Sequence, residues 1–413
     1  MTKFLITLLG VARCLRAVVV FSVMGLDYWL FPRSRTLDAR NARRLEWLLR
    51  RNGGTWIKAG QFLSARPDLL KAPYIERLVP LQYQVEPERD AHVYSVLKRV
   101  YGDAWYARFE EFHHTPVAGA SIAVVYRARL LDGREVALKI KRKHIDHLFA
   151  VDLAFYRLIA RVASRLSGKF DLVGAVDAFL RSLSRELDFV QEAQNVKTFG
   201  ALPHLPGVRI PALIEECCND QVVALEWMEA MPIVSYLESA SASEQERLIT
   251  LLQNSYIQQI VRFGLMQGDP HPGNFMVTAA GELVLLDFGL LAPLTDAERV
   301  SYVNIMLAII EGDVAAFARA LERAGVTNLP VSAFSGKLVN VLASVSMSGA
   351  FQLSNDELEA LLLDLYRMLN QHAVYIPDHF LLTGRVLIAL TGLIRRYGCA
   401  PQPIQIKQIL FDV

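Results

Sequence analysis

The sequence reads Gln267-Gly268-Asp269-Pro270-His271-Pro272-Gly273-Asn274 in one segment and Leu286-Asp287-Phe288-Gly289 a little further on, and these two segments decide the fold. Asp269 and Asn274 lie five positions apart, and Asp287 follows after enough residues for a short β-hairpin. Carboxylate and amide oxygens are the ligands that Mg²⁺ prefers. Three such side chains at these separations can hold metal ions against a triphosphate. The two segments therefore predict a site for ATP and Mg²⁺.

This spacing is typical of protein kinases, and it gives each residue an expected role. Asp269 is the candidate catalytic residue that orients the attacking water or hydroxyl, and Asn274 and Asp287 are the candidate metal ligands. Lys139 ends the strand-like run Val-Ala-Leu-Lys after a predicted Asp-Gly hairpin turn, where a kinase places the lysine that contacts the phosphates. Glu192, on a helix after Lys139, is the expected ion-pair partner of this lysine.

Two further segments are expected to line the nucleotide. A kinase covers the phosphates with a glycine-rich loop, because backbone N–H groups must approach them closely. The corresponding segment here has one glycine where that loop has three, and on its own it is an ordinary small-residue turn. A hinge that offers backbone groups to adenine is expected near Trp227. The candidate nucleotide contacts of these segments are Ala118, Gly119, Ala120, Ser121, Glu226 and Met228.

Three acidic residues lie close together in a segment predicted to be helical from 144 to 200. Glu186, Asp188 and Glu192 would repel one another unless a cation or a metal lies among them. Glu186 and Asp188 are therefore further candidate metal ligands. For Asp188 taken alone, a solvated helix face is an equal alternative.

Length and composition exclude several other classes of protein. The chain has 413 residues with ample apolar content, enough for one large two-lobed domain or two to three smaller ones. Its net charge of +2 is too near neutral for nucleic acid as the main partner. The four cysteines form no metal-type pair and no obvious disulfide framework, which favours a reducing, cytoplasmic compartment.

The N-terminal part is strongly basic. Residues 1–66 contain twelve Lys and Arg against three Asp and Glu, a net charge of +9. Such a segment beside apolar helices suits an anionic membrane surface. The uncharged run Ala17–Leu26 is shorter than the roughly 20 residues that a span requires. We therefore expect an amphipathic helix that lies on a membrane or on the body of the protein, rather than a transmembrane span.

Taken together, these motifs resemble the UbiB family of atypical, protein-kinase-like proteins, which is associated with coenzyme Q biosynthesis. The resemblance covers about residues 50 to 300. Lys58-Ala59-Gly60-Gln61 is similar to the KxGQ signature of that family, the segment 118–121 to its alanine-rich loop, and Glu186-Leu187-Asp188 to its ExD motif. Ordinary protein kinases lack these three motifs, so their coincidence with the catalytic loop and the Asp-Phe-Gly motif is specific.

The resemblance implies an α+β, two-lobed protein-kinase-like fold with an N-terminal helical extension and a mostly helical C-lobe. The expected domains are a basic amphipathic segment (1–50), the KxGQ extension (51–112), the N-lobe (113–229) and the C-lobe (230–413). In the family the KxGQ helix is thought to cover the active site, so that Lys58 and Gln61 face the nucleotide and join the candidate catalytic residues. Lys58 then offers a cation to Glu186 and Asp188.

The resemblance also implies a function. It points to an ATPase or small-molecule kinase that supports ubiquinone or other prenyl-quinone biosynthesis, peripherally bound to the inner face of a membrane. The implied partners are a lipid or isoprenoid-quinone intermediate and enzymes of quinone biosynthesis; the oligomeric state stays open. Two alternatives remain: a kinase of a soluble substrate, and a nucleotide-gated scaffold without catalysis.

The sequence departs from the family pattern at three positions. Gly119 interrupts the run of alanines, and Val124 and Tyr126 stand where Gln and His are common. Because glycine relaxes the backbone restriction that alanine imposes, we expect an altered grip on the nucleotide. The chain also ends at Val413 without the C-terminal transmembrane helices of many bacterial relatives, so the N-terminal helices or a partner are expected to provide membrane attachment.

Overall fold

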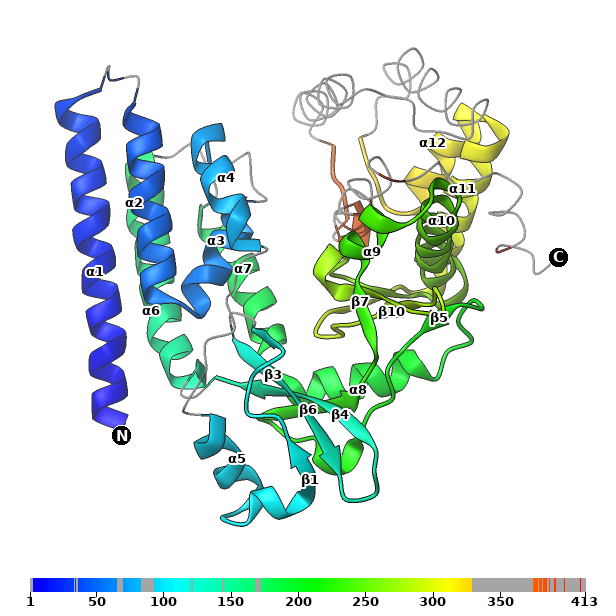
Figure 1. Ribbon diagram of the computed structural model, residues 1–413. Coiled ribbons are helices and arrows are strands. Elements are labelled where there is room, and N and C mark those ends of the chain that lie inside the picture. The colour runs from blue at the N-terminus through cyan, green and yellow to red at the C-terminus, as the bar shows by residue number, and fades with distance from the viewer. Residues whose placement is uncertain are drawn as a thin grey trace. The chain divides into compact units, whose positions relative to one another are not determined.

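Figure 1 shows the computed structural model of the protein. The structure describes residues 3–32, 34, 36–64, 70–82, 93–119, 122–142, 145–167, 172–328 and 374–377, and a few positions between 379 and 409. It divides into two compact units. The first contains residues 1–194 and 212–227, and the second contains residues 195–211 and 228–413. The finer, four-part division expected from the sequence stays a prediction.

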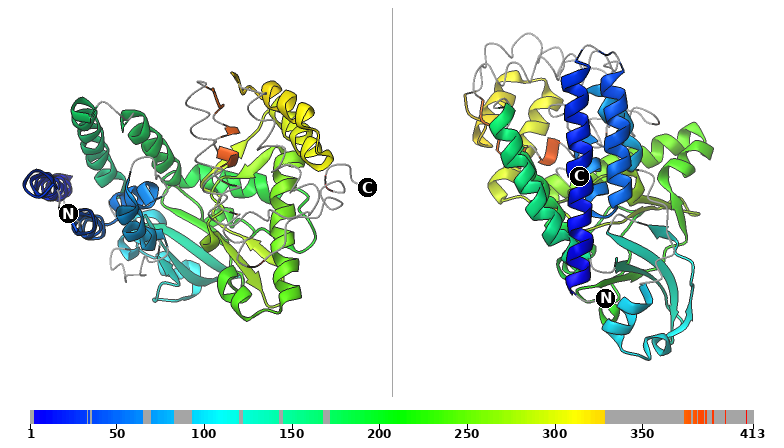
Figure 2. Two further views of the ribbon diagram at one scale, coloured as in Figure 1. Left: turned by 90° about the horizontal axis from the view of Figure 1, so that it is seen from above. Right: turned by 90° about the vertical axis from the view of Figure 1, so that its left-hand side faces the viewer.

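The first unit begins with a helical layer. Its helices are α1 (Lys3–Leu30), α2 (Leu37–Asn52), α3 (Thr55–Ser64), α4 (Ala72–Leu78), the 3₁₀ turn η1 (Val79–Gln82), α6 (Ile145–Ser167) and α7 (Leu172–Glu186). α1 packs against both α2 and α6, and the views in Figures 1 and 2 show these three long helices side by side. Their shared core includes Leu48, Trp56, Leu78 and Phe155, all buried.

Helix α1 is longer than the uncharged run Ala17–Leu26 that the sequence singled out. It continues through Arg13 and Arg16, and its segment Thr7–Leu30 is long and apolar enough to cross a membrane by length and composition. The expectation of a segment too short to span is therefore wrong as a statement about length. The reason is that a long helix can include charged residues whose partners lie on neighbouring helices. The length of an uncharged run in the sequence does not take such partners into account.

A buried polar cluster fixes α1 to the rest of the layer, and we call it the Asp152 cluster. Asp152, on α6, is fully buried. One of its carboxylate oxygens lies 3.0 Å from the Arg13 guanidinium and accepts a hydrogen bond from the Thr55 hydroxyl, while the other accepts one from the Trp56 indole at 3.0 Å. A buried charge requires such partners. Because Arg13 belongs to α1 and Thr55 begins α3, the cluster ties three helices together.

An antiparallel sheet forms the other part of this unit. Its central order is β1 (Phe109–Phe112), β3 (Ala123–Leu130), β4 (Glu135–Lys141) and β6 (Val222–Glu226), with β2 (Ala118–Gly119) paired to β3. The predicted Asp-Gly turn joins β3 to β4, and Gly133 adopts a φ of 85° there, which glycine adopts without steric cost. Alternate residues of β3 and β4 are buried, among them Val124, Tyr126 and Leu138. Helix α5 (Val93–Tyr101) and the 3₁₀ turn η2 (Trp105–Arg108) pack on this core.

Helix α8 (Phe189–Gly200) begins in the first unit and ends in the second. The second unit contains a sheet of order β5-β10-β9-β7 and a two-stranded sheet of β8 and β11. Their bounds are β5 (Val208–Arg209), β7 (Ala230–Pro232), β8 (Leu265–Gln267), β9 (Phe275–Thr278), β10 (Leu283–Leu285) and β11 (Leu291–Pro293). The helices are α9 (Ile233–Ser239), α10 (Ala242–Gln258), the π-helical turn η4 (Gln259–Phe263), the 3₁₀ turn η5 (Pro272–Asn274), α11 (Asp296–Glu311) and α12 (Val314–Arg323).

The mixed α+β class agrees with the prediction. The sequence also predicts helical structure over 74–110, interrupted at Pro80 and Pro87, and from Asp287 to about 398, and the structure differs from this at two places. A strand, β1, stands at the end of the segment 74–110, which was expected to be helical. Its residues Phe109 and Phe112 pack on aromatic rings of the sheet core, so tertiary contacts outweigh local helix propensity. The short strand β11 also precedes the first helix after Asp287. The expected helices beyond residue 328 lie for the most part outside the described residues.

Candidate active site

The first unit brings Lys139 and Glu192 together. Lys139 lies on the central strand β4, and its Nζ is 2.6 Å from Oε1 of Glu192 in the first turn of α8. The Lys139 side chain is 21% exposed and that of Glu192 is 3% exposed. A nearly buried carboxylate is strongly favoured to keep a cationic partner. The pair is therefore held in place while the lysine stays accessible at its tip.

The ring of Phe189 supports the same lysine. Lys139 Nζ lies 5.4 Å and Lys141 Nζ lies 5.1 Å from the centroid of this buried ring. A cation within about 6 Å of an aromatic face is attracted by its quadrupole. Phe189 follows Asp188 and starts α8, so the helix start positions both the acid that pairs with Lys139 and an aromatic surface for its stem.

Lys58 and Glu186 form a second ion pair in this unit. Lys58 lies on α3 and Glu186 ends α7; their charged atoms are 2.6 Å apart, with side chains 22% and 28% exposed. The cation expected among the acidic residues is thus supplied to Glu186 by Lys58. This contact brings the KxGQ helix to the Glu-x-Asp motif, although 128 positions separate them in the sequence.

The geometry also explains the glycine of the Lys-Ala-Gly-Gln segment. A Cβ at Gly60 would lie 2.5 Å from Cδ1 of Leu81 and 2.8 Å from Cδ1 of Leu49, so a larger residue there would force these buried leucine side chains to shift. The next residue, Gln61, donates its side-chain N–H to the Leu81 carbonyl at 2.8 Å. Gln61 therefore joins α3 to η1 in this structure, and its expected catalytic role stays a prediction.

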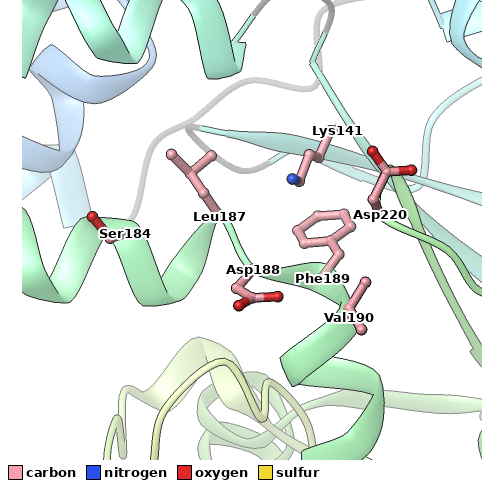
Figure 3. A pocket seen from close by; sticks show the side chains of 7 residues that line it. All are labelled: Lys141, Ser184, Leu187, Asp188, Phe189, Val190 and Asp220. Carbon is pink, nitrogen blue, oxygen red and sulfur yellow. The ribbon is translucent and has the colours of Figure 1, made fainter.

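Asp188 caps a helix and lines a cavity. Its carboxylate accepts a hydrogen bond from the Gln191 backbone N–H at 2.9 Å, which satisfies a donor at the start of α8. It lines a cavity of about 220 Å³ together with Phe189, Lys141 and Asp220, and Figure 3 shows these side chains. Lys141 is 5% exposed, and its amine lies 3.4 Å from a carboxylate oxygen of Asp146. Asp188 thus has a structural role at the surface, and metal binding by it stays a prediction.

The predicted phosphate loop begins as a strand. Val124 and Val125 of β3 lie opposite the first two residues of the loop, Ala118 and Gly119, which form β2. Ala120 and Ser121 lie outside the described residues. The alanine-rich segment is therefore anchored to the sheet at its N-terminal end.

The predicted hinge coincides with the passage between the two units, since the first unit ends at Trp227 and the second resumes at Met228. The backbone N–H of Glu226 donates to the Ala212 carbonyl at 2.8 Å, and that of Trp227 donates to the Glu135 carbonyl at 2.9 Å. These two donors are already engaged. The expected contacts of Glu226 and Met228 with adenine stay predictions.

The second unit carries the catalytic loop between β8 and β9. The Asn274 side chain donates to the backbone carbonyl of Asp269 at 2.9 Å, and the Asn274 carbonyl accepts from the Leu286 N–H at 2.8 Å. His271 braces the loop, since its Nδ1 accepts a hydrogen bond from the Gly273 N–H at 3.1 Å. Asn274 thereby connects the loop that bears Asp269 to the segment that bears Asp287.

Asp287 is held in a strained conformation. Its φ is 60°, in the left-handed region that residues other than glycine rarely adopt. Its carboxylate accepts a hydrogen bond from the Gly289 N–H at 3.0 Å. Phe288 is fully buried and packs on Phe199, with ring centroids 5.2 Å apart. Strain of this kind persists at functional sites where the surroundings determine it.

One residue that holds Asp287 was not identified from the sequence. Gln267 is fully buried; its amide nitrogen donates to the carbonyl oxygens of Leu286 and Asp287, the latter at 2.8 Å, and its amide oxygen accepts from the Tyr256 hydroxyl at 2.8 Å. The Gln267 backbone N–H donates to the Gln259 side chain at 2.9 Å. Burial raises the pKa of Tyr256 well above its usual value, so the hydroxyl stays a donor. A polar residue inside a short apolar strand was the available signal.

The donor atoms at this site fit Mg²⁺. Asp287 offers a carboxylate and Asn274 an amide oxygen, both of the hard oxygen type that this ion prefers. Within the described ranges, no group of three or more His, Cys, Asp or Glu residues could hold a metal ion by itself. This agrees with Mg²⁺ chemistry in kinases, where one or two side chains and the nucleotide phosphates share the ion.

Residues 80–321 match the ABC1 atypical kinase-like domain. The chain belongs to the ABC1 atypical kinase-like family. This confirms the resemblance drawn from the motifs, because the aarF and UbiB proteins are of this type. It also confirms the predicted kinase-like α+β fold with helices at its N-terminal end. Kinase-like ABC1 domains use ATP and Mg²⁺ in general.

Curated ABC1 relatives come from bacteria and chloroplasts. The chain is 27% identical to ACTIVITY OF BC1 COMPLEX KINASE 1 of Arabidopsis thaliana, a chloroplastic protein, over 92% of this chain and 57% of that protein. It is 30% identical to a chloroplastic aarF domain-containing protein kinase of the same plant, over 87% of this chain and 51% of that protein. An uncharacterised Synechocystis protein is 28% identical over 86% of this chain and 63% of its own length. The chain thus spans between half and two thirds of these relatives.

Among solved structures, the complex of Rv3197 with erythromycin from Mycobacterium tuberculosis is similar to this ABC1 protein. The TM-score is 0.63 at 25% identity, and the match covers 87% of this chain and 92% of that one. The similarity thus extends over nearly the whole of that protein.

Proposed function

We propose that this ABC1 protein is a Mg²⁺-dependent ATPase or small-molecule kinase that supports the synthesis of ubiquinone or another prenyl-quinone at a membrane. The observation that carries the proposal is the Lys139–Glu192 ion pair at 2.6 Å, because a protein kinase needs this pair to position the phosphates of ATP. A protein without phosphoryl-transfer chemistry has no need for this pair together with Asp269, Asn274 and Asp287.

In the proposed reaction each of these residues has a distinct task. Lys139, oriented by Glu192, contacts the α- and β-phosphates. Asn274 and Asp287 hold Mg²⁺, which supplies charge neutralisation when bound. Asp269 orients the attacking water or hydroxyl. The strained backbone at Asp287 keeps its carboxylate aimed in one direction, so less reorganisation is required at the moment of reaction.

The Lys58–Glu186 contact favours a small or lipid-borne acceptor over a protein. This pair holds α3 against the end of α7, so a helix that ordinary kinases lack is fixed at the Glu-x-Asp motif. We propose a lipid or isoprenoid-quinone intermediate as the partner, presented at an anionic membrane surface, with quinone-biosynthesis enzymes as further partners. The Rv3197 complex with erythromycin makes small-molecule ligands a reasonable part of the test.

The experiment measures ADP release from Mg-ATP by the purified full chain, with and without anionic vesicles that carry a phenolic quinone-precursor analogue. Asp287→Asn should abolish Mg²⁺-dependent turnover. Asp296→Asn is the matched control, since Asp296 is an exposed residue at the start of α11. Turnover that rises with the vesicle mixture supports the proposal.

Other outcomes would redirect the assignment. ADP release by Asp287→Asn at the wild-type rate would show that Asp287 does not hold the metal ion. Turnover that responds to soluble acceptors and not to vesicles would favour a soluble-substrate kinase. ATP binding without any ADP release would favour a nucleotide-gated scaffold.

A further inference from the structure

One face of α1 is apolar, exposed and continuous over the whole helix; we call it the outer face. Its most exposed large side chains are 53% to 78% exposed, and they are Phe4, Leu8, Leu15, Val19, Leu26 and Trp29. The other described exposed residues of α1 are small or uncharged, such as Ala12, Ser22 and Gly25. Within the described side chains of α1, the outer face therefore carries no charge.

Every charged residue between Phe4 and Leu30 is turned toward the protein instead. Arg13 pairs with Asp152 at 3.0 Å. Arg16 donates to the Asn52 side chain, and Asp27 accepts from Arg40 of α2 at 2.8 Å and also from Arg44. The charged side chains of α1 therefore contact the rest of the first unit, and the apolar side chains of the outer face are exposed. A continuous exposed apolar face on a helix marks an interaction surface.

The two helices that flank α1 both carry exposed arginines. α1 runs parallel to α6, since Gly10 contacts Val151 and Arg13 contacts Asp152, and antiparallel to α2, since Asp27 meets Arg40 and Arg16 meets Asn52. Figure 2 shows α2 and α6 on the two flanks of α1. The exposed arginines of these flanks are Arg43, Arg50 and Arg51 on α2 and Arg157, Arg161 and Arg165 on α6.

The charge of these flanks is predominantly positive. Arg50 pairs with Glu46 and Arg157 with Asp177. The other four arginines make no ion pair with any residue that the structure describes, and they are Arg43, Arg51, Arg161 and Arg165. Basic side chains beside an apolar helix face attract anionic lipid headgroups and stay at the level of those headgroups.

This arrangement favours one orientation of α1 relative to a bilayer. A helix of this length and composition could cross a bilayer by itself, but α1 is packed along its length between α2 and α6. Crossing would carry the flanking arginines into hydrocarbon, which is strongly unfavourable. Lying in the plane of the interface inserts only the outer face and leaves the arginines among the headgroups.

We infer that α1 lies in the plane of an anionic bilayer, with its outer face inserted and the arginines of α2 and α6 contacting the headgroups. This inference rests on the proposed function for its membrane setting, and it names the surface that makes the contact. It requires no contribution from the catalytic residues.

The test is co-sedimentation of the full-length protein with vesicles of phosphatidylcholine alone or with added phosphatidylglycerol. Wild-type protein should bind the anionic vesicles more tightly, and added salt should weaken binding. Leu15→Glu/Val19→Glu should lower the partition coefficient at least tenfold. Leu131→Glu is the matched control, because Leu131 is 71% exposed in the β3–β4 turn and should bind as wild type.

A second measurement uses a milder variant in case the double variant does not fold. Brominated lipids should quench part of the tryptophan fluorescence of the wild-type protein, and Trp29→Phe should remove most of that quenching while Trp105→Phe should not. Unchanged vesicle binding by Leu15→Glu/Val19→Glu, or unchanged quenching in Trp29→Phe, would overturn the inference. A dimer that this double variant dissociates, without any vesicle binding by the wild type, would assign the face to a second copy of the chain.

ADP release without lipid separates this inference from the proposed function. If Leu15→Glu/Val19→Glu loses vesicle binding but releases ADP at the wild-type rate without lipid, the outer face serves for membrane docking alone. Normal vesicle binding by a protein without turnover would leave this inference standing and remove the proposed function.

Discussion

Replacing Gln267 by leucine tests how the protein holds its metal-binding carboxylate. Leucine has a similar size but no polar atoms, so the carbonyl oxygens of Leu286 and Asp287 lose their donor and the Tyr256 hydroxyl loses its acceptor. Leaving a buried polar group unsatisfied costs about 1–3 kcal/mol. At about 1 kcal/mol for each of three groups, the loss is about 3 kcal/mol in the free energy of unfolding.

Part of this loss falls on the conformation of Asp287. A non-glycine residue at a φ of 60° has a strain of about 1–3 kcal/mol that its surroundings must offset. If about 1.4 kcal/mol of the lost stabilisation acts there, the ratio of the aligned to the misaligned carboxylate falls about tenfold. The concentration of Mg²⁺ that gives half-maximal ADP release should then rise, by up to about tenfold where the misaligned form becomes the major one. A Mg²⁺ titration of turnover measures this shift.

The control is Gln258→Leu, which removes another buried amide of the same unit. Gln258 is 4% exposed and donates to the Pro203 carbonyl at 3.0 Å, away from Asp287. It should lower the temperature of unfolding without changing the Mg²⁺ dependence. The reasoning is refuted if Gln267→Leu and Gln258→Leu show the same Mg²⁺ dependence once both are measured well below their unfolding temperatures.

Two further predictions concern stability. Gly60→Ala should destabilise the protein by about 1–3 kcal/mol through overpacking against Leu81, and the same substitution should cost less in a Leu81→Ala background. Thermal unfolding of the wild type, both single variants and the double variant checks this, and equal unfolding temperatures for wild type and Gly60→Ala would contradict it. Burial lowers the pKa of His204 below 6.5, so below that pH the unfolded chain binds its proton more readily, and the unfolding temperature should fall as pH drops from 7.5 to 5.5. His204→Gln should flatten that dependence, and an unaltered slope in this variant would exclude His204 as its source.

Much of the kinase-like fold could be predicted from the sequence because its motifs are local. The catalytic loop, the Asp-Phe-Gly motif and the strand that bears Lys139 are each written in consecutive residues, and their spacing is a property of the chain alone. Glu192 was also predictable as the partner of Lys139, since kinase chemistry requires an acid on a later helix. The contact at 2.6 Å then follows from how α8 begins at Phe189.

What the sequence did not provide depends on long-range packing. The role of Gln267 requires the backbone of Leu286 and Asp287 to pass beside β8, and no periodicity encodes that approach. The hydrogen bond from Gln61 to the Leu81 carbonyl likewise depends on the close packing of α3 and η1 at Gly60, while the expected role of Gln61 at the nucleotide stays a prediction. Such contacts arise from tertiary arrangement, which overrides what a residue type suggests alone.

The length of α1 shows the same limit. Arg13 and Arg16 divide its apolar sequence, which argued against a membrane span. In the structure, both residues have partners on other elements of the first unit, so the helix continues past them. A charge inside an apolar run is therefore informative only together with its partner, and that partner can lie more than a hundred positions away, as Asp152 does from Arg13.

The Asp152 cluster has a practical consequence for anyone who shortens this protein. An N-terminal helix with an apolar outside invites removal to improve solubility. Cutting away α1 would leave the fully buried carboxylate of Asp152 without the Arg13 guanidinium, and breaking a buried ion pair costs about 3–5 kcal/mol. That loss would be felt at Thr55 and Trp56, the first turn of the helix that carries Lys58. A trimmed protein that dissolves well but has lost its turnover would therefore report damage to α3, and not the absence of a membrane.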